Sequence, residues 1–503
     1  MTMFTLTTLN ARYSHSSIGL RYLYANMQEL QSETCIQEFT INDQIQDVAE
    51  QLLAKKPSAI GIGVYIWNVL QCAALVETIK KVSPNTIIIL GGPEVSYSPM
   101  RVNFDVVDYI VQGEGDLAFY QLVKAIQSGL PPTERIIKAA LPDINAIKSP
   151  YAYYTDEDVK NRYIYVEASR GCPFQCEFCL SSRDEKVRNF DIDVFLRDLD
   201  MLWQRGVRNF KFIDRTFNLN IKIASRLLDF FLSKPTPYFV HFEVIPDHFP
   251  EALKQRMTQF EPATLQLEIG IQTLNLDIAK NIHRNLKMDK IEQNIAFLEH
   301  ETSAHMHLDL IVGLPGEGLN SFGLGLNKLV SMSKAEIQIG ILKKLAGTTL
   351  DRHDSMYGMV YSDMPPYDIL RNDVLSFEDI QKMKRFARFW NLYYNSGNFK
   401  QSIVQLWSDN DVFTHFFDFS VWLYGQSNST WKISLERLAE YLFHYRVQIQ
   451  QAKPEEVASL LLQDIMKLEG RKVPNFLKPF AQGLDVHRRL AQGHNKRQIR
   501  HMV

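Results

Sequence analysis

Cysteine is scarce in this chain of 503 residues, which has only five. A small secreted domain held by disulfides needs a dense and usually even set of cysteines, so this class is excluded. An excess of charge of one sign is also lacking, because 55 lysines and arginines balance 57 aspartates and glutamates. The chain therefore has no overall basic field that would hold nucleic acid non-specifically.

Long hydrophobic runs are also rare, and the one notable uncharged stretch covers residues 58–76. Two glycines and the polar Asn68 and Gln71 interrupt this stretch, so we expect a buried strand and the start of a helix rather than a membrane span. Residues 1–10 carry no basic region before an apolar core, so a secretory signal is not expected. These absences predict a cytoplasmic protein.

The remaining composition is that of a folded globular protein, with 46% hydrophobic and 22% charged residues. At roughly 150 residues per domain, the length predicts about three domains. We expect an α/β domain over 1–130, a linker rich in proline over 131–160, a second α/β domain over 161–345 and a mainly helical region over 346–503.

The first domain alternates short apolar runs with amphipathic stretches. This alternation predicts a doubly wound parallel sheet, whose ligands bind beyond the carboxyl ends of the strands. The expected strands cover 3–9, 59–65, 86–90 and 106–111, and the expected helices cover 17–30, 68–81 and 116–128.

Two glycine loops follow neighbouring strands of this predicted sheet. Glycine lets the backbone approach a large flat ligand or a phosphate, although a glycine also serves simply to turn a strand into a helix. Two such loops at adjacent strand ends favour a ligand, and the lack of GxGxxG after the first strand disfavours a dinucleotide fold. The candidate residues are His15, Tyr65, Trp67, Asn68, Gly91, Gly92, Gly113, Glu114 and Gly115.

Three of the five cysteines, Cys172, Cys176 and Cys179, form the spacing CxxxCxxC after an expected strand at 163–168. Three thiolates in one tight loop can ligate three irons of a [4Fe–4S] cluster and leave the fourth iron open. A closed zinc site is the weaker alternative, because it needs four ligands, usually in two separated pairs. Structural buried cysteines have no reason to keep this spacing.

With the aromatic Phe178 before its last cysteine, this motif resembles the signature of the radical S-adenosylmethionine (SAM) superfamily. The following pattern fits the partial (βα)6 barrel of that superfamily, in which functional groups sit at the carboxyl ends of the strands. The six expected strands cover 163–168, 207–213, 238–244, 264–270, 305–312 and 335–341.

The resemblance also implies residues that bind SAM. Asp214 lies in the loop that replaces the superfamily's glycine-glycine-glutamate motif, which receives the methionine amino group. Gln272 and Thr273 match a serine-containing motif near the cofactor, Glu243 is expected to hold ribose hydroxyls, and Arg284 to pair with a carboxylate. A structural ion pair inside the barrel is the alternative role for three carboxylates, Glu243, Glu268 and Asp309.

An open α/β sheet followed by such a barrel resembles the cobalamin-binding class of radical SAM enzymes, over about residues 1–345. The motif Asp-x-His-x-x-Gly, which supplies the lower cobalt ligand in part of that class, is not intact. His15 stands at the position of its histidine, but Tyr13 replaces the aspartate and Ile18 the glycine. A hydrogen-bonding role in a loop is the alternative for His15.

The pattern changes after about residue 350, where helical spacing over 370–394 is followed by many aromatic residues. Aromatic residues at helical spacing are expected to form a core. The region 346–450 resembles an extension of unknown function found in one subgroup of the same class. The basic tail is expected to be a solvated end rather than a nucleic-acid contact, and comprises Arg488, Arg489, Lys496, Arg497 and Arg500.

The resemblance implies an anaerobic enzyme with a [4Fe–4S] cluster, SAM and cobalamin, reduced by a donor such as flavodoxin or ferredoxin. Its expected reaction is radical methylation of an unactivated carbon in a substrate that the sequence does not name. A methylthio-transferring RNA modification enzyme is one alternative, but only Cys35 and Cys72 remain for the three ligands of its second cluster. A non-catalytic cobalamin-dependent sensor is the other.

Overall fold

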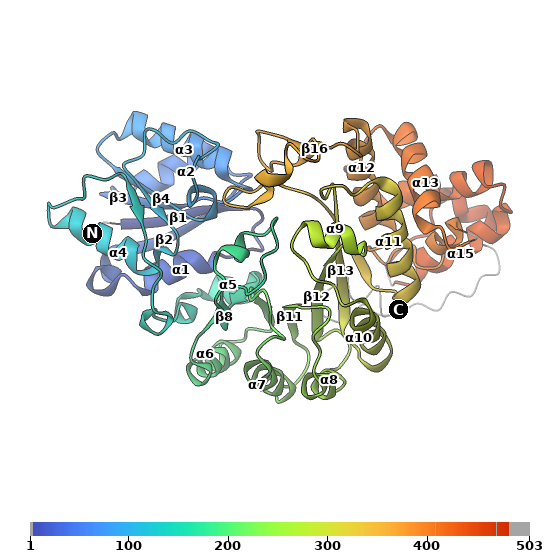
Figure 1. Cartoon of the computed structure of the whole chain (residues 1–503), viewed down its shortest axis with the longest axis horizontal. Coiled ribbons are helices and arrows are strands. Elements are labelled where there is room, and N and C mark those ends of the chain that lie inside the picture. Colours follow the sequence, from blue (N-terminus) through green and yellow to red (C-terminus); the bar gives the residue numbers. More distant parts are fainter. Residues whose placement is uncertain (1–3, 408, 469, 482–503) are drawn as a thin grey trace. The chain divides into compact units, whose positions relative to one another are not determined.

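The computed structural model describes residues 4–407, 409–468 and 470–481 (Figure 1). The chain divides into two compact units, each of which is described by itself. The first unit comprises 1–215, 343–350 and 362–368, and the second comprises 216–342, 351–361 and 369–503.

The first unit contains a sheet of six parallel strands in the order β2-β1-β3-β4-β5-β6. This order confirms the expected doubly wound sheet, with its switch point between β1 and β3. The strands are β1 (Phe4–Asn10), β2 (Thr34–Thr40), β3 (Ala59–Gly63), β4 (Ile87–Gly91), β5 (Tyr109–Gln112) and β6 (Ile136–Lys138).

Helices cover both faces of this sheet (Figure 1). On one face, α2 (Ile45–Leu53) and α3 (Val69–Val82) pack on the apolar residues of β3 and β4. On the other, α1 (Ile18–Ala25) and α4 (Gly115–Gln127) form a second core with Phe4, Leu6 and Ile89. Burial on both faces explains the nearly continuous isoleucine run of β4.

Three segments of the first unit differ from the sequence prediction. Strand β2 and helix α2 were not expected. Strand β2 is an edge strand whose side chains after the first are only half-buried, so its sequence shows no apolar run. The segment 131–160, predicted as a linker, contributes the short edge strand β6 and helix α5 (Asp156–Asn161). The helix predicted over 17–30 ends at Ala25 and is followed by a 3-10 turn at Gln28–Glu33.

A second sheet has six strands in the order β14-β13-β12-β11-β10-β7 and forms the expected partial barrel. Its strands are β7 (Ile164–Val166), β10 (Asn209–Phe212), β11 (Phe239–Val244), β12 (Leu265–Gln272), β13 (His305–Val312) and β14 (Glu336–Ile341). The helices between them are α6 (Ile192–Gln204), α7 (Ile221–Leu232), α8 (Glu251–Met257), α9 (Leu276–Asn281), α10 (Met288–Glu301) and α11 (Leu319–Met332). The division between the two units falls after β10, at Arg215.

The region after β14 is mainly helical, as expected, but begins with a small hairpin. Its strand β16 occupies the start of the helix predicted over 370–394, and that helix begins only at Phe377, where Ser376 and Asp379 form a capping box. Phe416 and Phe419 are buried in an aromatic core, whereas Trp431 is exposed. The basic tail lies outside the described residues. The elements are β15 (Val360–Tyr361), β16 (Ile369–Arg371), α12 (Phe377–Tyr393), α13 (Val412–Ser427), α14 (Leu435–His444) and α15 (Pro454–Met466).

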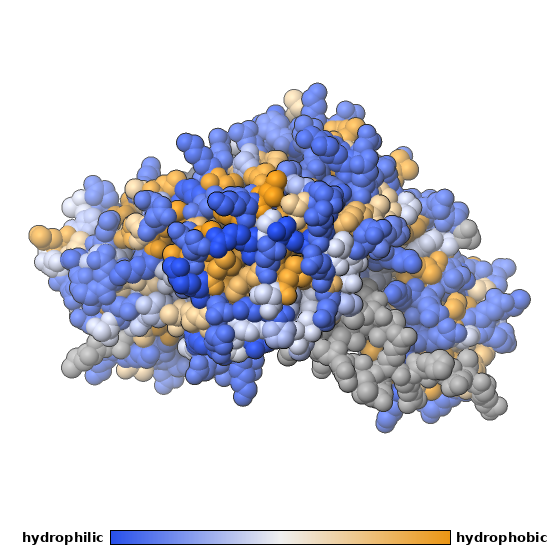
Figure 2. Space-filling model, turned by 90° about the horizontal axis from the view of Figure 1, so that it is seen from below, coloured by the Kyte–Doolittle hydropathy of each residue, from blue (hydrophilic) through white to orange (hydrophobic). Residues whose placement is uncertain are grey.

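The surface mixes hydrophilic and hydrophobic side chains, and Figure 2 shows one face on which hydrophobic patches lie between hydrophilic residues. Isolated exposed apolar residues are normal for folded proteins. Among the described residues, no helix combines the length and the apolar character needed to cross a bilayer.

Candidate active site

The three clustered cysteines lie in a hairpin loop of the first unit. Its base is a short antiparallel pair, β8 (Ser169–Arg170) and β9 (Arg188–Asn189). Gly171 begins the loop with a φ of +89°, and a Cβ atom there would lie 2.3 Å from the backbone oxygen of Lys186. Only glycine fits this turn, because any side chain would clash with the opposite backbone of the hairpin.

The loop offers three cysteine thiols as candidate ligands for an iron–sulfur cluster. Cys172 and Cys176 are buried, Cys179 is half-buried, and none forms a disulfide. The Cys172 N–H donates to the backbone oxygen of Asp184 (2.9 Å) and the Cys179 N–H to that of Cys176 (3.1 Å). These bonds order the loop. The set of three thiols fits a [4Fe–4S] cluster with one open iron.

Asp214 supports the entry to this loop rather than lying free at the strand end. Its carboxylate accepts the N–H of Ala168 (3.0 and 3.1 Å) and the hydroxyl of Ser169 (2.6 Å). Burial raises the pKa of Asp214 to about 7 despite these hydrogen bonds. The geometry makes Asp214 a positioning residue for the hairpin, and its direct contact with SAM stays a prediction.

A cavity of about 180 Å³ opens at the carboxyl ends of β3, β4 and β5. Its lining contains the expected Tyr65, Gly91, Gly92, Gly113 and Gly115, as well as Arg170 from the cysteine hairpin. The cavity thus lies where doubly wound sheets bind their ligands.

Glycines shape this cavity in two ways. At Gly92, with a φ of +105°, a Cβ atom would lie 2.5 Å from the backbone oxygen of Val64, so the turn after β4 requires glycine. At Gly91, a Cβ atom would meet only the backbone oxygen of Val111 at 3.8 Å. The missing side chain at Gly91 therefore leaves space rather than avoiding a clash, which fits the approach of a bulky cofactor.

Two of the residues expected beside this cavity hold the strand ends together. Asn68 is fully buried and donates to the backbone oxygens of Leu9 (3.0 Å) and Gly63 (3.2 Å), so it joins β1 to β3. The indole of Trp67 donates to the same oxygen of Leu9 (3.2 Å) and stacks on Tyr65, with ring centroids 4.5 Å apart. Tyr65 is the member of this group that lines the cavity.

His15 does not line the cavity. Its Nδ1 lies 2.5 Å from the hydroxyl of Tyr165, and its ring stacks on Tyr165 and is tilted against Tyr163. Burial lowers the pKa of His15, and the charges of Lys211 and Arg12 act in the same direction. The geometry matches the hydrogen-bonding role, and a role as lower cobalt ligand stays a prediction.

Two arginines link the cysteine hairpin to the loop after β5. Arg170 contacts Glu114 (2.7 Å) and Asp116 (2.9 Å) through Nη1, and Glu167 (2.9 Å) through Nε. Arg188, which faces Arg170 across the β8–β9 pair, also binds Glu114. The hairpin that carries the cysteines is therefore clamped to the edge of the glycine-lined cavity by charge-assisted hydrogen bonds.

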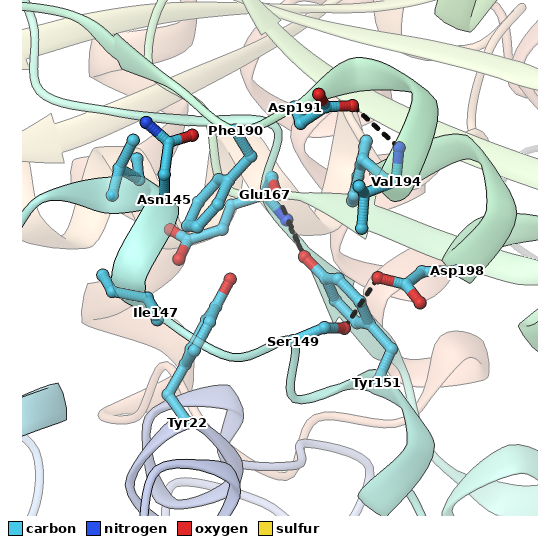
Figure 3. A pocket seen from close by; sticks show the side chains of 12 residues that line it. Tyr22, Asn145, Ile147, Ser149, Tyr151, Glu167, Phe190, Asp191, Val194 and Asp198 are labelled. Atoms are coloured by element: carbon cyan, nitrogen blue, oxygen red, sulfur yellow. Dashed lines mark hydrogen bonds between the residues drawn. The ribbon is translucent and has the colours of Figure 1, made fainter.

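A smaller hollow of about 110 Å³ lies beside this clamp (Figure 3). Tyr22 lines both this hollow and the glycine-lined cavity. Figure 3 shows that its hydroxyl points toward Glu167. The Glu167 N–H donates to the hydroxyl of Tyr151 (3.1 Å). Burial raises the pKa of Glu167 while Arg170 opposes that shift, so this carboxylate depends on its arginine partner.

Charged groups also gather inside the barrel in the second unit. Glu243 pairs in register with Glu268, and Gly270 with Asp309, so their side chains share one face of the sheet. Burial and the two neighbouring glutamates raise the pKa of Asp309, and Arg284 lowers it. Arg284 donates to the backbone oxygen of Gly270 (2.7 Å), and His241 Nε2 lies 2.9 Å from Glu268. These side chains form a charged cluster. The contact of Glu243 with ribose hydroxyls and that of Arg284 with a carboxylate stay predictions.

The bulge at the end of β12 carries Gln272 and Thr273. Gln272 has a φ of +72°, and the strand register shifts there. The Thr273 hydroxyl is buried and donates to Glu317 (2.7 Å), which also accepts from Ser321 (3.1 Å). Burial raises the pKa of Glu317 to about 7. Thr273 thus anchors the bulge, and Gln272 is the more accessible of the two.

Sequence reasoning missed the arginines of the clamp. Arg170 stands two residues before the first cysteine of the motif, and Glu114 lies in a glycine loop that had already been selected. Their 56-residue separation follows no periodicity, so the pairing is visible only in the fold.

Three families of known domains match successive parts of the chain. Residues 5–123 match the B12 binding domain, 166–323 the radical SAM superfamily, and 355–501 a family described as a protein of unknown function, DUF4080.

One similar protein is the cobalamin-dependent radical SAM methyltransferase TokK of Streptomyces tokunonensis, 24% identical over 63% of this chain and 51% of that protein. The chain spans about half the length of the first curated relatives it matches. The fold resembles that of the cobalamin-dependent SAM radical enzyme OxsB, with a TM-score of 0.61, 11% identity and coverage of 92% of this chain and 78% of that one. The methyltransferase TsrM from Kitasatospora setae gives a TM-score of 0.58 at 14% identity, over 72% and 77% of the two chains.

The chain therefore combines a B12-binding domain, a radical SAM domain and a DUF4080 region, and it is homologous to the cobalamin-dependent radical SAM methyltransferases.

Proposed function

We propose that this protein is a cobalamin-dependent radical SAM enzyme that transfers a methyl group to an unactivated carbon of its substrate. The observation that carries the proposal is the clamp of Arg170 and Arg188, which fixes the three-cysteine hairpin to the edge of the glycine-lined cavity. One compact unit thus joins a loop suited to an iron–sulfur cluster with a cavity suited to cobalamin.

When bound, the cluster and SAM supply a 5′-deoxyadenosyl radical, and cobalamin supplies a transferable methyl group; the chain binds and orients these groups. Cys172, Cys176 and Cys179 hold three irons and leave the fourth for SAM. The backbone at Gly91 and Gly92 admits the bulky cofactor to the strand ends.

The barrel residues of the second unit serve SAM in this proposal. The carboxylate of Glu243 accepts hydrogen bonds from ribose hydroxyls, and the guanidinium of Arg284 pairs with the SAM carboxylate. Gln272, on its bulge, offers an amide close to the end of β12. A reducing protein such as flavodoxin or ferredoxin, and a cytoplasmic location, belong to the same proposal.

The two alternatives are less well supported. The methylthio-transferring enzyme needs three more cysteines, but Cys72 lies on α3 and is buried in the core, and Cys35 lies on β2 beside Lys55 (3.3 Å). These two residues cannot supply a second cluster. A sensor without turnover does not need the open iron that three cysteines leave.

The first experiment is anaerobic purification from cells supplied with cobalamin, followed by an ultraviolet–visible spectrum and joint quantification of iron and cobalt. About four irons and about one cobalt per chain are expected. About four irons without cobalt would refute the cobalamin part, clearly more iron would favour the methylthio-transferring enzyme, and zinc without iron would refute the cluster.

The cluster assignment is tested by Cys176→Ala, with Cys35→Ser as the matched control. The first variant should lose most of its iron and all reductive cleavage of SAM to 5′-deoxyadenosine, because two thiolates cannot hold the cluster. The control should retain both. Methyl transfer itself is tested with methyl-labelled SAM and candidate substrates, and turnover that yields 5′-deoxyadenosine and a product without label would refute it.

A further inference from the structure

A second group of metal-ligating side chains lies at the amino ends of β13 and β14. His305 and His307 are two residues apart on β13, so both project from the same face of the strand. Glu336, the first residue of β14, is the register partner of His307. The three side chains therefore converge on one face of the barrel sheet, within the second unit.

Their ligand atoms lie close enough to share one ion. Nε2 of His305 is 3.1 Å from Oε1 of Glu336, and Nε2 of His307 is 3.5 Å from Oε2. All three ligand atoms lie within 4.8 Å of one another. Ligands at about 2.0–2.2 Å from a tetrahedral ion are roughly 3.3–3.6 Å apart, so only small side-chain movements are needed.

We propose that His305, His307 and Glu336 bind one divalent transition-metal ion of the zinc class. Two imidazoles and a carboxylate are a donor set that zinc and iron(II) prefer. The Glu336 carboxylate is fully buried, and a cation between it and the two imidazoles compensates a charge that is otherwise costly to bury. The imidazoles keep 14% and 11% of their side-chain surface exposed, which gives an ion access.

The surroundings of the group resemble the second ligand shell of a metal site. The amides of Gln338 and Gln266 lie 2.5 and 3.2 Å from Nδ1 of His307, so its Nε2 is aimed at Glu336. The oxygen and nitrogen of a glutamine amide exchange places by a simple flip, so a carbonyl can accept the Nδ1–H of a metal-bound imidazole. Asn395 holds β14 at the next residue, through both backbone atoms of Ile337 (2.9 and 2.7 Å).

The three proposed ligands are not among the residues proposed to bind SAM, and they lie beside the charged cluster on the same face of the sheet. Asp309 is two residues further along β13 than His307, which corresponds to about 7 Å along a strand, and Glu268 is the register partner of His307. The metal joins β13 to the edge strand β14, whose first residue is the ligand Glu336. Its role is thus to fix the edge of the partial barrel.

The test loads the cluster-reconstituted protein with zinc alone, removes loosely bound ions by gel filtration, and quantifies zinc and iron. The occupied cysteines then cannot take zinc. About one zinc per chain is expected in the wild type, and less than a tenth of that in His307→Gln and Glu336→Gln. The matched control is His241→Gln, a buried histidine of the same barrel that contacts Glu268, and it should keep its zinc.

Zinc-edge X-ray absorption of the wild type provides a readout that does not depend on folding of the variants. A shell of nitrogen and oxygen at about 2.0–2.1 Å with imidazole scattering supports the site, whereas sulfur at about 2.3 Å places zinc on cysteine and overturns it. Gln338→Ala should weaken zinc binding by roughly 10–100-fold. A wild type without zinc shows a metal-free imidazole–carboxylate network and also refutes the proposal.

Discussion

Removing the Arg170 side chain is the most direct test of how the cysteine hairpin is held. Arg170→Ala leaves the carboxylates of Glu114, Asp116 and Glu167 close together, with only Arg188 still bound to Glu114. The Arg170 side chain is 14% exposed, so water can replace little of what is lost. Removing one partner of a buried ion pair costs about 3–5 kcal/mol.

Local hydrogen exchange measures this loss better than global unfolding, because a chain with several domains does not unfold in one step. A loss of about 3–5 kcal/mol lowers protection by roughly two to three and a half powers of ten, at about 1.4 kcal/mol for each. The fall should be confined to amides of the β5–α4 loop and the β8–β9 hairpin. Arg170→Lys should give an intermediate loss, since it keeps the charge without the forked geometry.

Arg437→Ala is the control, because this exposed arginine contacts nearby residues of its own helix α14, Glu440 (3.9 Å) and the hydroxyl of Tyr441 (3.1 Å), and protection of the hairpin should not change. A fall of less than about tenfold in Arg170→Ala would refute the reasoning, since the hairpin would then be held without the clamp.

Two further predictions concern the cavity and the bulge. Gly91→Val should lower the cobalt content and leave the iron content unchanged, because the valine side chain enters the cavity without a backbone clash. Gly425→Ala is the control, because a Cβ atom there lies in open space. An unchanged cobalt content in Gly91→Val would contradict the cavity assignment. Burial raises the pKa of Glu317 from 4.5 to about 7, because the buried site favours the protonated carboxyl group. Glu317 therefore contributes most to the stability of the fold below about pH 4.5, and this contribution is lost as the pH rises through 7. The melting temperature of the wild type should therefore fall relative to Glu317→Gln over this range, and a constant difference would disprove the shift.

Much of the sheet architecture could be predicted because parallel strands buried on both faces leave continuous apolar runs. The isoleucines of β4 and the six barrel strands gave this signal, and the ends of those strands located the glycine loops. Strand β2 gave no such signal, since most of its side chains are half-buried at the sheet edge.

The candidate site was predictable only where chemistry depends on local spacing. The three cysteines lie within eight residues, and their chemistry is readable from that spacing alone. The clamp depends on contacts across 54 and 56 residues, and the group of His305, His307 and Glu336 depends on the register of β13 and β14. Neither a long-range ion pair nor a strand register follows from a single sequence pattern.

The clamp has a consequence for exchanging parts of this protein with its relatives. A B12-binding domain transplanted in place of 5–123 removes Glu114 and Asp116 together, and so leaves two arginines of the hairpin facing each other across β8 and β9. The sheet and the hairpin are thus not independent modules, although separate family matches cover them. A functional chimera must therefore take the acidic loop with Glu114 and Asp116 and the arginines Arg170 and Arg188 from the same parent protein.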